Sequence, residues 1–169
     1  MAKHFNITGE LTRELLAPGD NVNISSVSLT NVDSSYSSTV DLYIEKKLTG
    51  KFYLLKGVSI PVGVTLLHDI KGFNNKANEF GLYIKLTKAA TFTLTGEIDP
   101  AASVTVVGVG TAFLSEVSIG DEIVVSGETR IVTAIASDTS LTVSVAFSNN
   151  SNDATPDCNP VPPVDVILS

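Results

Sequence analysis

The residue types that most often carry acid–base or nucleophilic chemistry are sparse in this chain. Histidine, the commonest general base and a frequent metal ligand, occurs only as His4 and His68. His68 ends an apolar run beside Asp69, and a neighbouring carboxylate can orient an imidazole. Because no nucleophile motif accompanies this pair, we interpret His68 as a loop or strand-end histidine and His4 as part of a terminal tail. The sequence predicts no catalytic residues, and we expect the protein not to be an enzyme.

Local groups of carboxylates occur at Asp121–Glu122 and at Asp153 and Asp157. A calcium loop of the EF-hand type needs alternating oxygen ligands around a central glycine, and neither group has that pattern. We interpret these carboxylates as solvated turn residues. The sequence therefore predicts no metal site.

Glycines and the single cysteine also have structural interpretations. Gly108 and Gly110 precede no predicted helix, and no Gly-Lys-Ser or Gly-Lys-Thr follows them or Gly120, so a phosphate-binding loop is not indicated. We expect these glycines to permit turns with positive φ, and we expect no cofactor. Cys158 has no second cysteine to pair with, which predicts a free structural thiol and a fold held by packing alone.

Composition narrows the range of partners. The net charge is −7 and the pI is about 4.7, so the excess of Lys and Arg that neutralises phosphates is missing and nucleic acid is not an expected partner. Apolar runs such as Ile119–Val125 are far shorter than the roughly 20 residues that span a bilayer. No signal-peptide pattern opens the chain. We expect a soluble protein made in the cytoplasm, with no membrane partner.

Apolar and polar residues alternate with period two along most of the first hundred residues, as in Val40, Leu42 and Ile44. This pattern is typical of half-buried strands, which recur about every ten residues between turn signals. Pro61 interrupts an apolar run from Val58 to Leu67, which predicts an edge strand or a bulge there. Only Leu11–Ala17 has enough helix formers to suggest a short helix.

Asp99-Pro100 marks a boundary, beyond which shorter and tighter strands follow up to about Ser148. After a polar loop with several prolines, Val164, Val166 and Leu168 alternate again as a last strand. A lone strand leaves backbone groups unpaired, so we expect it to return to the first sheet. The predicted fold class is all-β: an antiparallel β-sandwich of jelly-roll or immunoglobulin-like type, with a small SH3-like or similar β-barrel inserted before the last strand. The predicted domains are residues 1–96 plus 161–169 for the sandwich and 97–160 for the barrel.

Two segments resemble modules of virion structural proteins of tailed bacteriophages. Residues 23–67 contain strand phrases SLTN, VDLYI and IPVGVTL, which resemble those of a small β-sandwich, and the closing strand of such proteins often reads like VDVILS, as residues 164–169 do here. Residues 104–148 are similar to a second phage module with a GTGTAF turn and a VTAIASDTSLTV hairpin. The chain departs from that turn at Val109, where the usual residue is polar. No functional residue is carried over from either resemblance.

The resemblance implies a virion protein that assembles in the host cytoplasm and binds the major capsid protein or other virion proteins. We expect a capsid decoration or cement protein, acting as a homo-oligomer, with a trimer as the form suited to threefold lattice positions. Strand addition through residues 1–17 or through the C-terminal strand is one expected mode of contact. Tyr43, Phe52 and Tyr53 could line one exposed sheet face that binds a partner, but burial in the core is the favoured interpretation of these aromatic residues. The alternatives are a neck, tail or fibre adaptor and a host- or glycan-binding module.

Overall fold

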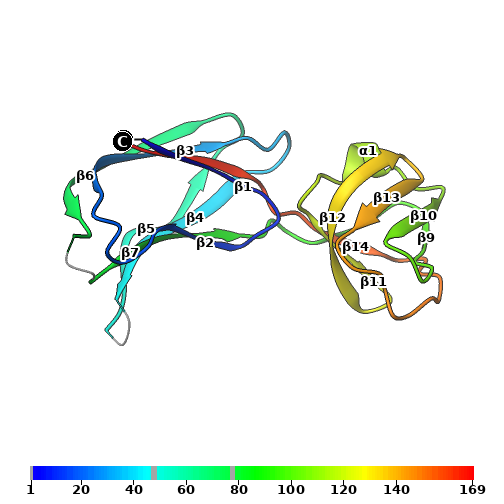
Figure 1. Cartoon of the computed structure of the whole chain (residues 1–169). Coiled ribbons are helices and arrows are strands. Elements are labelled where there is room, and N and C mark those ends of the chain that lie inside the picture. Colours follow the sequence, from blue (N-terminus) through cyan, green and yellow to red (C-terminus); the bar gives the residue numbers. More distant parts are fainter. Residues whose placement is uncertain (1, 47–48, 77–78) are drawn as a thin grey trace. The chain divides into compact units, whose positions relative to one another are not determined.

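The computed structural model describes residues 2–46, 49–76 and 79–169, and the chain divides into two compact units. Unit 1 consists of residues 1–88 and 162–169, and unit 2 consists of residues 89–161. Nearly all regular elements are antiparallel strands, with a single four-residue helix, α1 (Phe113–Glu116), among the described residues (Figure 1). The predicted all-β class is confirmed.

Unit 1 is a sandwich of two four-stranded antiparallel sheets. Its strands are β1 (Lys3–Ile7), β2 (Thr12–Leu16), β3 (Asn23–Asn31), β4 (Ser38–Lys46), β5 (Gly50–Ile60), β6 (Thr65–Asn74), β7 (Gly81–Thr87) and β15 (Val164–Leu168). Sheet A has the order β1-β15-β3-β6, and sheet B has the order β2-β7-β4-β5. The chain crosses between the sheets after every strand except β4, which forms a hairpin with β5. This strand order is that of a jelly roll, the double Greek key in which two sheets bury their facing sides.

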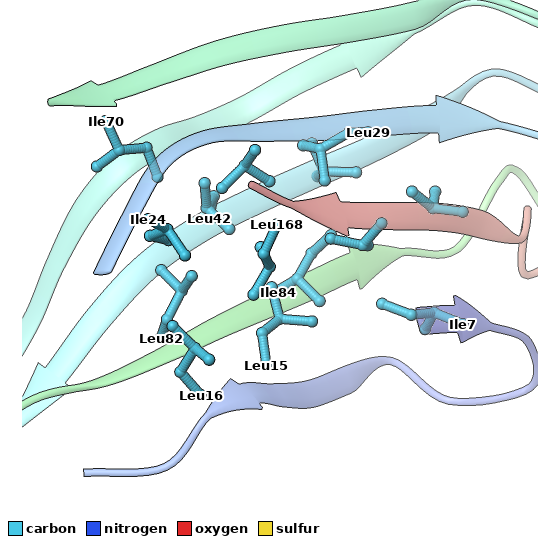
Figure 2. Close-up of a cluster of buried hydrophobic side chains, with 14 of the residues drawn as sticks. Ile7, Leu15, Leu16, Ile24, Leu29, Leu42, Ile70, Leu82, Ile84 and Leu168 are labelled. Carbon is cyan, nitrogen blue, oxygen red and sulfur yellow. The ribbon is translucent and has the colours of Figure 1, made fainter. Parts of the chain in front are cut away.

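The core of unit 1 follows from the period-two pattern. Val40 and Leu42 project inward from β4 and are fully buried, and Ile44 packs against the same cluster. Figure 2 shows inward-pointing side chains from both sheets meeting between them, among them Leu42, Ile84 and Leu168. Each fully buried Leu or Ile contributes roughly 1.5–3 kcal/mol relative to an exposed side chain, so this cluster supplies the main driving force for folding unit 1.

The last strand lies inside sheet A. In β15, Val164 pairs with Asn31 of β3 and with Ile7 of β1, so both edges of the strand are hydrogen-bonded. Val166 and Leu168 are fully buried on the inner face. The return of this strand to the first sheet is what the sequence predicted, and unit 2 is consequently inserted between β7 and β15.

The boundaries of the insertion differ from those predicted. Unit 2 begins at residue 89, eight residues before the predicted start at residue 97, and it ends at residue 161. The difference arises because β8 (Phe92–Thr93) pairs with β14 (Asp157–Asn159), and Leu94 is buried in the core of unit 2. Two residues of strand are too short to show a period in the sequence.

Unit 2 is built on one seven-stranded antiparallel sheet. Its further strands are β9 (Glu97–Asp99), β10 (Thr105–Val109), β11 (Glu122–Val125), β12 (Glu128–Ser137) and β13 (Ser140–Val143). The order β8-β14-β11-β12-β13-β10-β9 has two ends, so the closed barrel expected from the sequence is not formed by continuous strand pairing. A single antiparallel bridge between Ile98 and Asp153 joins β9 to the segment before β14.

Two local expectations have clear outcomes. The helix suggested for Leu11–Ala17 is wrong, because residues 12–16 form strand β2, which pairs with β7 and buries Leu15 and Leu16. Pairing and burial override a weak helix propensity in so short a segment. Pro61 lies in the turn of residues 61–64 that joins β5 to β6, so the run from Val58 to Leu67 is not one strand. Both β5 and β6 are edge strands, as expected for a run that contains a proline, but the register shifts of β5 lie between residues 53 and 58 and not at Pro61.

Candidate interaction surfaces

The two histidines lie on the outer strands of sheet A. His4 is on β1 and His68 is on β6, with β15 and β3 between them. Three strand spacings of about 4.8 Å separate these outer strands by roughly 14 Å. The fold therefore does not bring the histidines together into a shared site.

The predicted turn carboxylates bind backbone groups of unit 2. Asp121 is buried, and its two oxygens accept hydrogen bonds from the backbone N–H groups of Ser118 at 2.9 Å and Val161 at 2.8 Å. Asp153 accepts from the N–H of Ser126 at 2.6 Å. The interpretation of Asp121 as solvated is wrong, because the carboxylate caps a turn and holds the exit of the insertion. In the part of the chain that the structure describes, no three His, Cys, Asp or Glu side chains are grouped as metal ligands.

Cys158 is buried in the core of unit 2. Its Sγ atom lies 3.9 Å from Oδ2 of Asp121. Burial and the neighbouring carboxylate raise the pKa of the Cys158 thiol far above its usual range. A thiol held protonated in this way is unreactive, as a structural role requires.

Gly108 lies in β10, and Gly110 and Gly120 lie at turns of unit 2. Gly110 and Gly120 have φ values of 67° and 99°, as a turn role requires. Position 108 requires glycine for a different reason, since a Cβ atom there would lie 2.1 Å from Oγ1 of Thr111. That Thr111 hydroxyl donates to the carbonyl of Asp138 at 2.5 Å, which joins this segment to the β12–β13 hairpin. The segment of residues 108–111 and the hairpin therefore support each other structurally.

Three tyrosines form a row across the outer face of sheet B. Tyr43 of β4 is paired in register with Tyr83 of β7 and with Tyr53 of β5. The ring centroids are 5.6 Å apart for Tyr43–Tyr83 and 5.7 Å apart for Tyr43–Tyr53. The Nζ atoms of Lys51 and Lys56 each lie 4.4 Å from a ring centroid, over Tyr43 and Tyr53 respectively. We call this set of three rings the tyrosine row.

The end of the tyrosine row at β7 is held by a carboxylate. The Tyr83 hydroxyl donates to Glu14 on β2 at 2.7 Å, and this hydrogen bond, with burial and the nearby negative charge, raises the pKa of Tyr83 to about 12. Tyr43 is only 2% exposed although it faces outward, because its neighbours in the row and Lys51 cover it. Tyr53 remains 44% exposed at the β5 end.

Phe52 does not share the outer face with the tyrosines. It pairs with Ile44, whose side chain packs on the core, and its ring meets that of Phe80 edge-on at 5.9 Å between centroids. The side chain is still 49% exposed because β5 is an edge strand. The expectation that Tyr43, Phe52 and Tyr53 share one face is corrected, since successive strand residues point to opposite sides.

The sheet edges define where strand addition could occur. Among the described strands, β1 and β6 bound sheet A, and β2 and β5 bound sheet B. The C-terminal strand was an expected docking edge, but β15 is paired on both sides and has no edge to offer. Of the N-terminal residues 1–17, Met1 lies outside the described residues, while β1 and β2 are each edge strands paired on one side. The longest edge is the 11-residue β5.

Comparisons with known proteins add little to this geometry. No protein-family model and no curated protein matches the chain. A chain of the T13 IBDV viral particle, whose crystal structure "reveals a missing link in icosahedral viruses evolution", aligns with 99% of this chain and with 35% of its own length, at 10% identity and a TM-score of 0.26. This chain thus spans about a third of that protein, and a TM-score this low supports no statement about function. Within the described residues, no helix has the length and apolarity to cross a membrane.

Proposed function

We propose that this chain is a structural, non-enzymatic protein of a viral particle, and specifically a bacteriophage capsid decoration or cement protein. In this role it binds the major capsid protein on the outer lattice and joins neighbouring subunits, as a homo-oligomer suited to threefold positions. The observation that carries the proposal is the β5 edge of the jelly roll, where Phe52 and Tyr53 are 49% and 44% exposed.

An exposed strand edge of this kind supports binding to a flat lattice. Strand addition supplies main-chain hydrogen bonds without a preformed groove, and alternate side chains supply specificity. Phe52 and Tyr53 project to opposite sides of the edge and provide the aromatic anchors that dominate many interfaces. A lattice repeats such a contact many times, so modest affinity per copy is sufficient.

The test uses particles that lack the protein and purified full-length chain added back. We expect the added protein to co-sediment with the particles and to saturate at a fixed number of copies per capsomer. The double variant F52S/Y53S should bind the particles with at least tenfold lower affinity. The matched control is L67S/I167S, which removes two exposed apolar side chains from the outer face of sheet A. Absence of wild-type binding, or equal loss in both variants, would contradict the proposal.

Copy number separates the decoration role from a neck, tail or fibre adaptor. Hundreds of copies per particle in quantitative mass spectrometry support decoration, whereas about three to twelve support an adaptor at a tail or neck ring. A glycan-binding role is less well supported, because the lysine ammonium groups over Tyr43 and Tyr53 occupy positions where a sugar ring would stack.

A further inference from the structure

Charge is distributed unevenly between the two units. Ten of the 11 Lys and Arg residues lie in unit 1, and Arg130 alone lies in unit 2. The 18 Asp and Glu residues divide into nine in each unit. Unit 1 therefore has a formal net charge of +1 and unit 2 of −8, which together give the −7 of the whole chain.

The charge of unit 2 restricts what it can bind. Arg130 is already engaged with Glu128 in an ion pair, so the unit contains no second cation to neutralise its other carboxylates. A field of this sign repels nucleic acid, anionic membranes and the same unit of another copy. It attracts surfaces that carry Lys and Arg, and it raises their rate of association.

An apolar strip lies on the outer face of β10. Val107 and Val109 alternate with the buried Val106 and Gly108, and they are 48% and 66% exposed. They occupy positions i and i+2 of one strand, so their side chains are neighbours about 6.5–7 Å apart on one face. Exposed single valines are ordinary, but an adjacent pair on one strand face forms a continuous contact surface.

Carboxylates border this strip on the adjacent strand. Val107 pairs with Asp99 and Val109 pairs with Glu97 of β9, and directly paired residues project to the same face. Figure 1 shows β9, β10 and β13 lying next to one another in unit 2. Glu97 accepts a hydrogen bond from Asn152 at 2.6 Å and Asp99 accepts one from the backbone N–H of Ala101 at 3.2 Å. These contacts hold the two carboxylates in place beside the valines, without a cation.

We infer that the outer face of β9 and β10 is a docking surface for a cationic protein surface, with Val107 and Val109 as the apolar centre and Glu97 and Asp99 as the charged rim. Lys or Arg side chains of the partner pair with the two carboxylates, while their aliphatic stems or a neighbouring apolar residue cover the valines. Charge complementarity selects this class of occupant. The inference goes beyond the proposed function, because it concerns unit 2 and not the β5 edge of unit 1.

The test maps binding of a defined probe on the full-length protein. The probe is an extended seven-residue peptide of alternating Lys and Val, and its control is the same peptide with Glu in place of Lys. We expect amide chemical-shift changes in NMR spectra centred on residues 97–99 and 105–109, with the Lys peptide only, and affinity that falls as salt rises from 50 to 300 mM. Changes spread evenly over unit 2, centred on the β5 edge, or absent would overturn the inference.

Charge-matched variants distinguish this face from the overall charge of the unit. E97Q/D99N should lower the affinity for the Lys peptide about 3- to 10-fold, mainly through slower association, since two exposed charge pairs are lost. E122Q/D157N removes the same charge on β11 and β14, which are not adjacent to β9 or β10, and should weaken binding of the peptide less than twofold. V107S/V109S should weaken binding mainly through faster dissociation. Equal effects of the two charge variants would also overturn the inference. As a control for folding, the buried Cys158 of each variant should remain protected against thiol reagents under native conditions.

Discussion

Substitution of Leu168 tests whether β15 is a buried strand of sheet A in unit 1. It is the next-to-last residue of the chain, yet it is fully buried between the two sheets, whereas its neighbour Ile167 is 43% exposed on the outer face. Ser169 keeps this end of β15 in place, because its carbonyl accepts from the N–H groups of Ser25 and Ser26 at 2.7 and 3.0 Å. Substitution of Leu168 should therefore act as a core mutation although it lies at a terminus.

The expected magnitudes follow from burial. L168A should lower the free energy of unfolding by about 2–5 kcal/mol, the range for emptying a packed leucine site. I167A should cost about 1 kcal/mol or less, because an outward side chain leaves no cavity. Unit 1 contains 88 residues before the insertion and eight after it. For a domain of this size each kcal/mol shifts Tm by about 4–8 °C, so L168A should lower Tm by about 8 °C or more.

The chain offers a selective probe for this measurement. Its four tyrosines, Tyr36, Tyr43, Tyr53 and Tyr83, all lie in unit 1, and it has no tryptophan. Tyrosine emission during urea denaturation therefore reports the unfolding of unit 1 without interference from unit 2. Equal effects of L168A and I167A, or no effect of L168A, would show that β15 is not a buried strand of sheet A.

Three further predictions concern buried and hydrogen-bonded groups. N31A should destabilise unit 1 by about 2–3 kcal/mol in the same tyrosine assay, because the Asn31 amide is fully buried and donates to the carbonyls of Tyr36 and Ile60, each at 2.9 Å. Hydrogen bonds from Ser148 and Asn149 lower the pKa of Glu128 to about 2, below its ordinary 4.5, so the ionised carboxylate stabilises unit 2 above about pH 4.5 and this contribution is lost as the pH falls towards 2. The Tm difference between wild type and E128Q in thermal circular dichroism should accordingly be largest near neutral pH and disappear near pH 2; a constant difference would contradict this assignment. Cys158 should resist Ellman's reagent at pH 8 in the native protein and react fully in urea, and rapid native labelling would show that the core of unit 2 is open.

Strand alternation made much of unit 1 predictable from sequence. Val40, Leu42 and Ile44 identified β4, and the alternation of residues 164–168 together with the need to pair a lone strand predicted that β15 returns to the first sheet. Which strands pair with each other was harder to predict, because strand pairing depends on contacts between residues that are distant in the sequence. The start of the insertion was predicted eight residues too late, since β8 shows no period of its own.

The interaction surfaces were harder to predict than the fold. Phe52 and Tyr53 are adjacent residues of one strand, so period two alone excludes a shared face for them. The pairing of Tyr43 with Tyr53 depends on the register of β4 with β5, including its two shifts, and local sequence does not encode that register. The acidity of unit 2 could have been found by counting charges on either side of a domain boundary. The position of Glu97 and Asp99 beside Val107 and Val109 could not have been predicted, because it depends on the pairing of β9 with β10.

The central claim, that this jelly roll with an inserted acidic unit is a structural protein of a viral shell, is tested most directly by a reconstruction of the intact particle at side-chain resolution. The account predicts density for unit 1 on the outer capsid lattice at every equivalent capsomer, with the β5 edge and its Phe52 and Tyr53 side chains against the major capsid protein. A particle whose lattice carries no such density, or carries it with β5 facing solvent, would contradict the account.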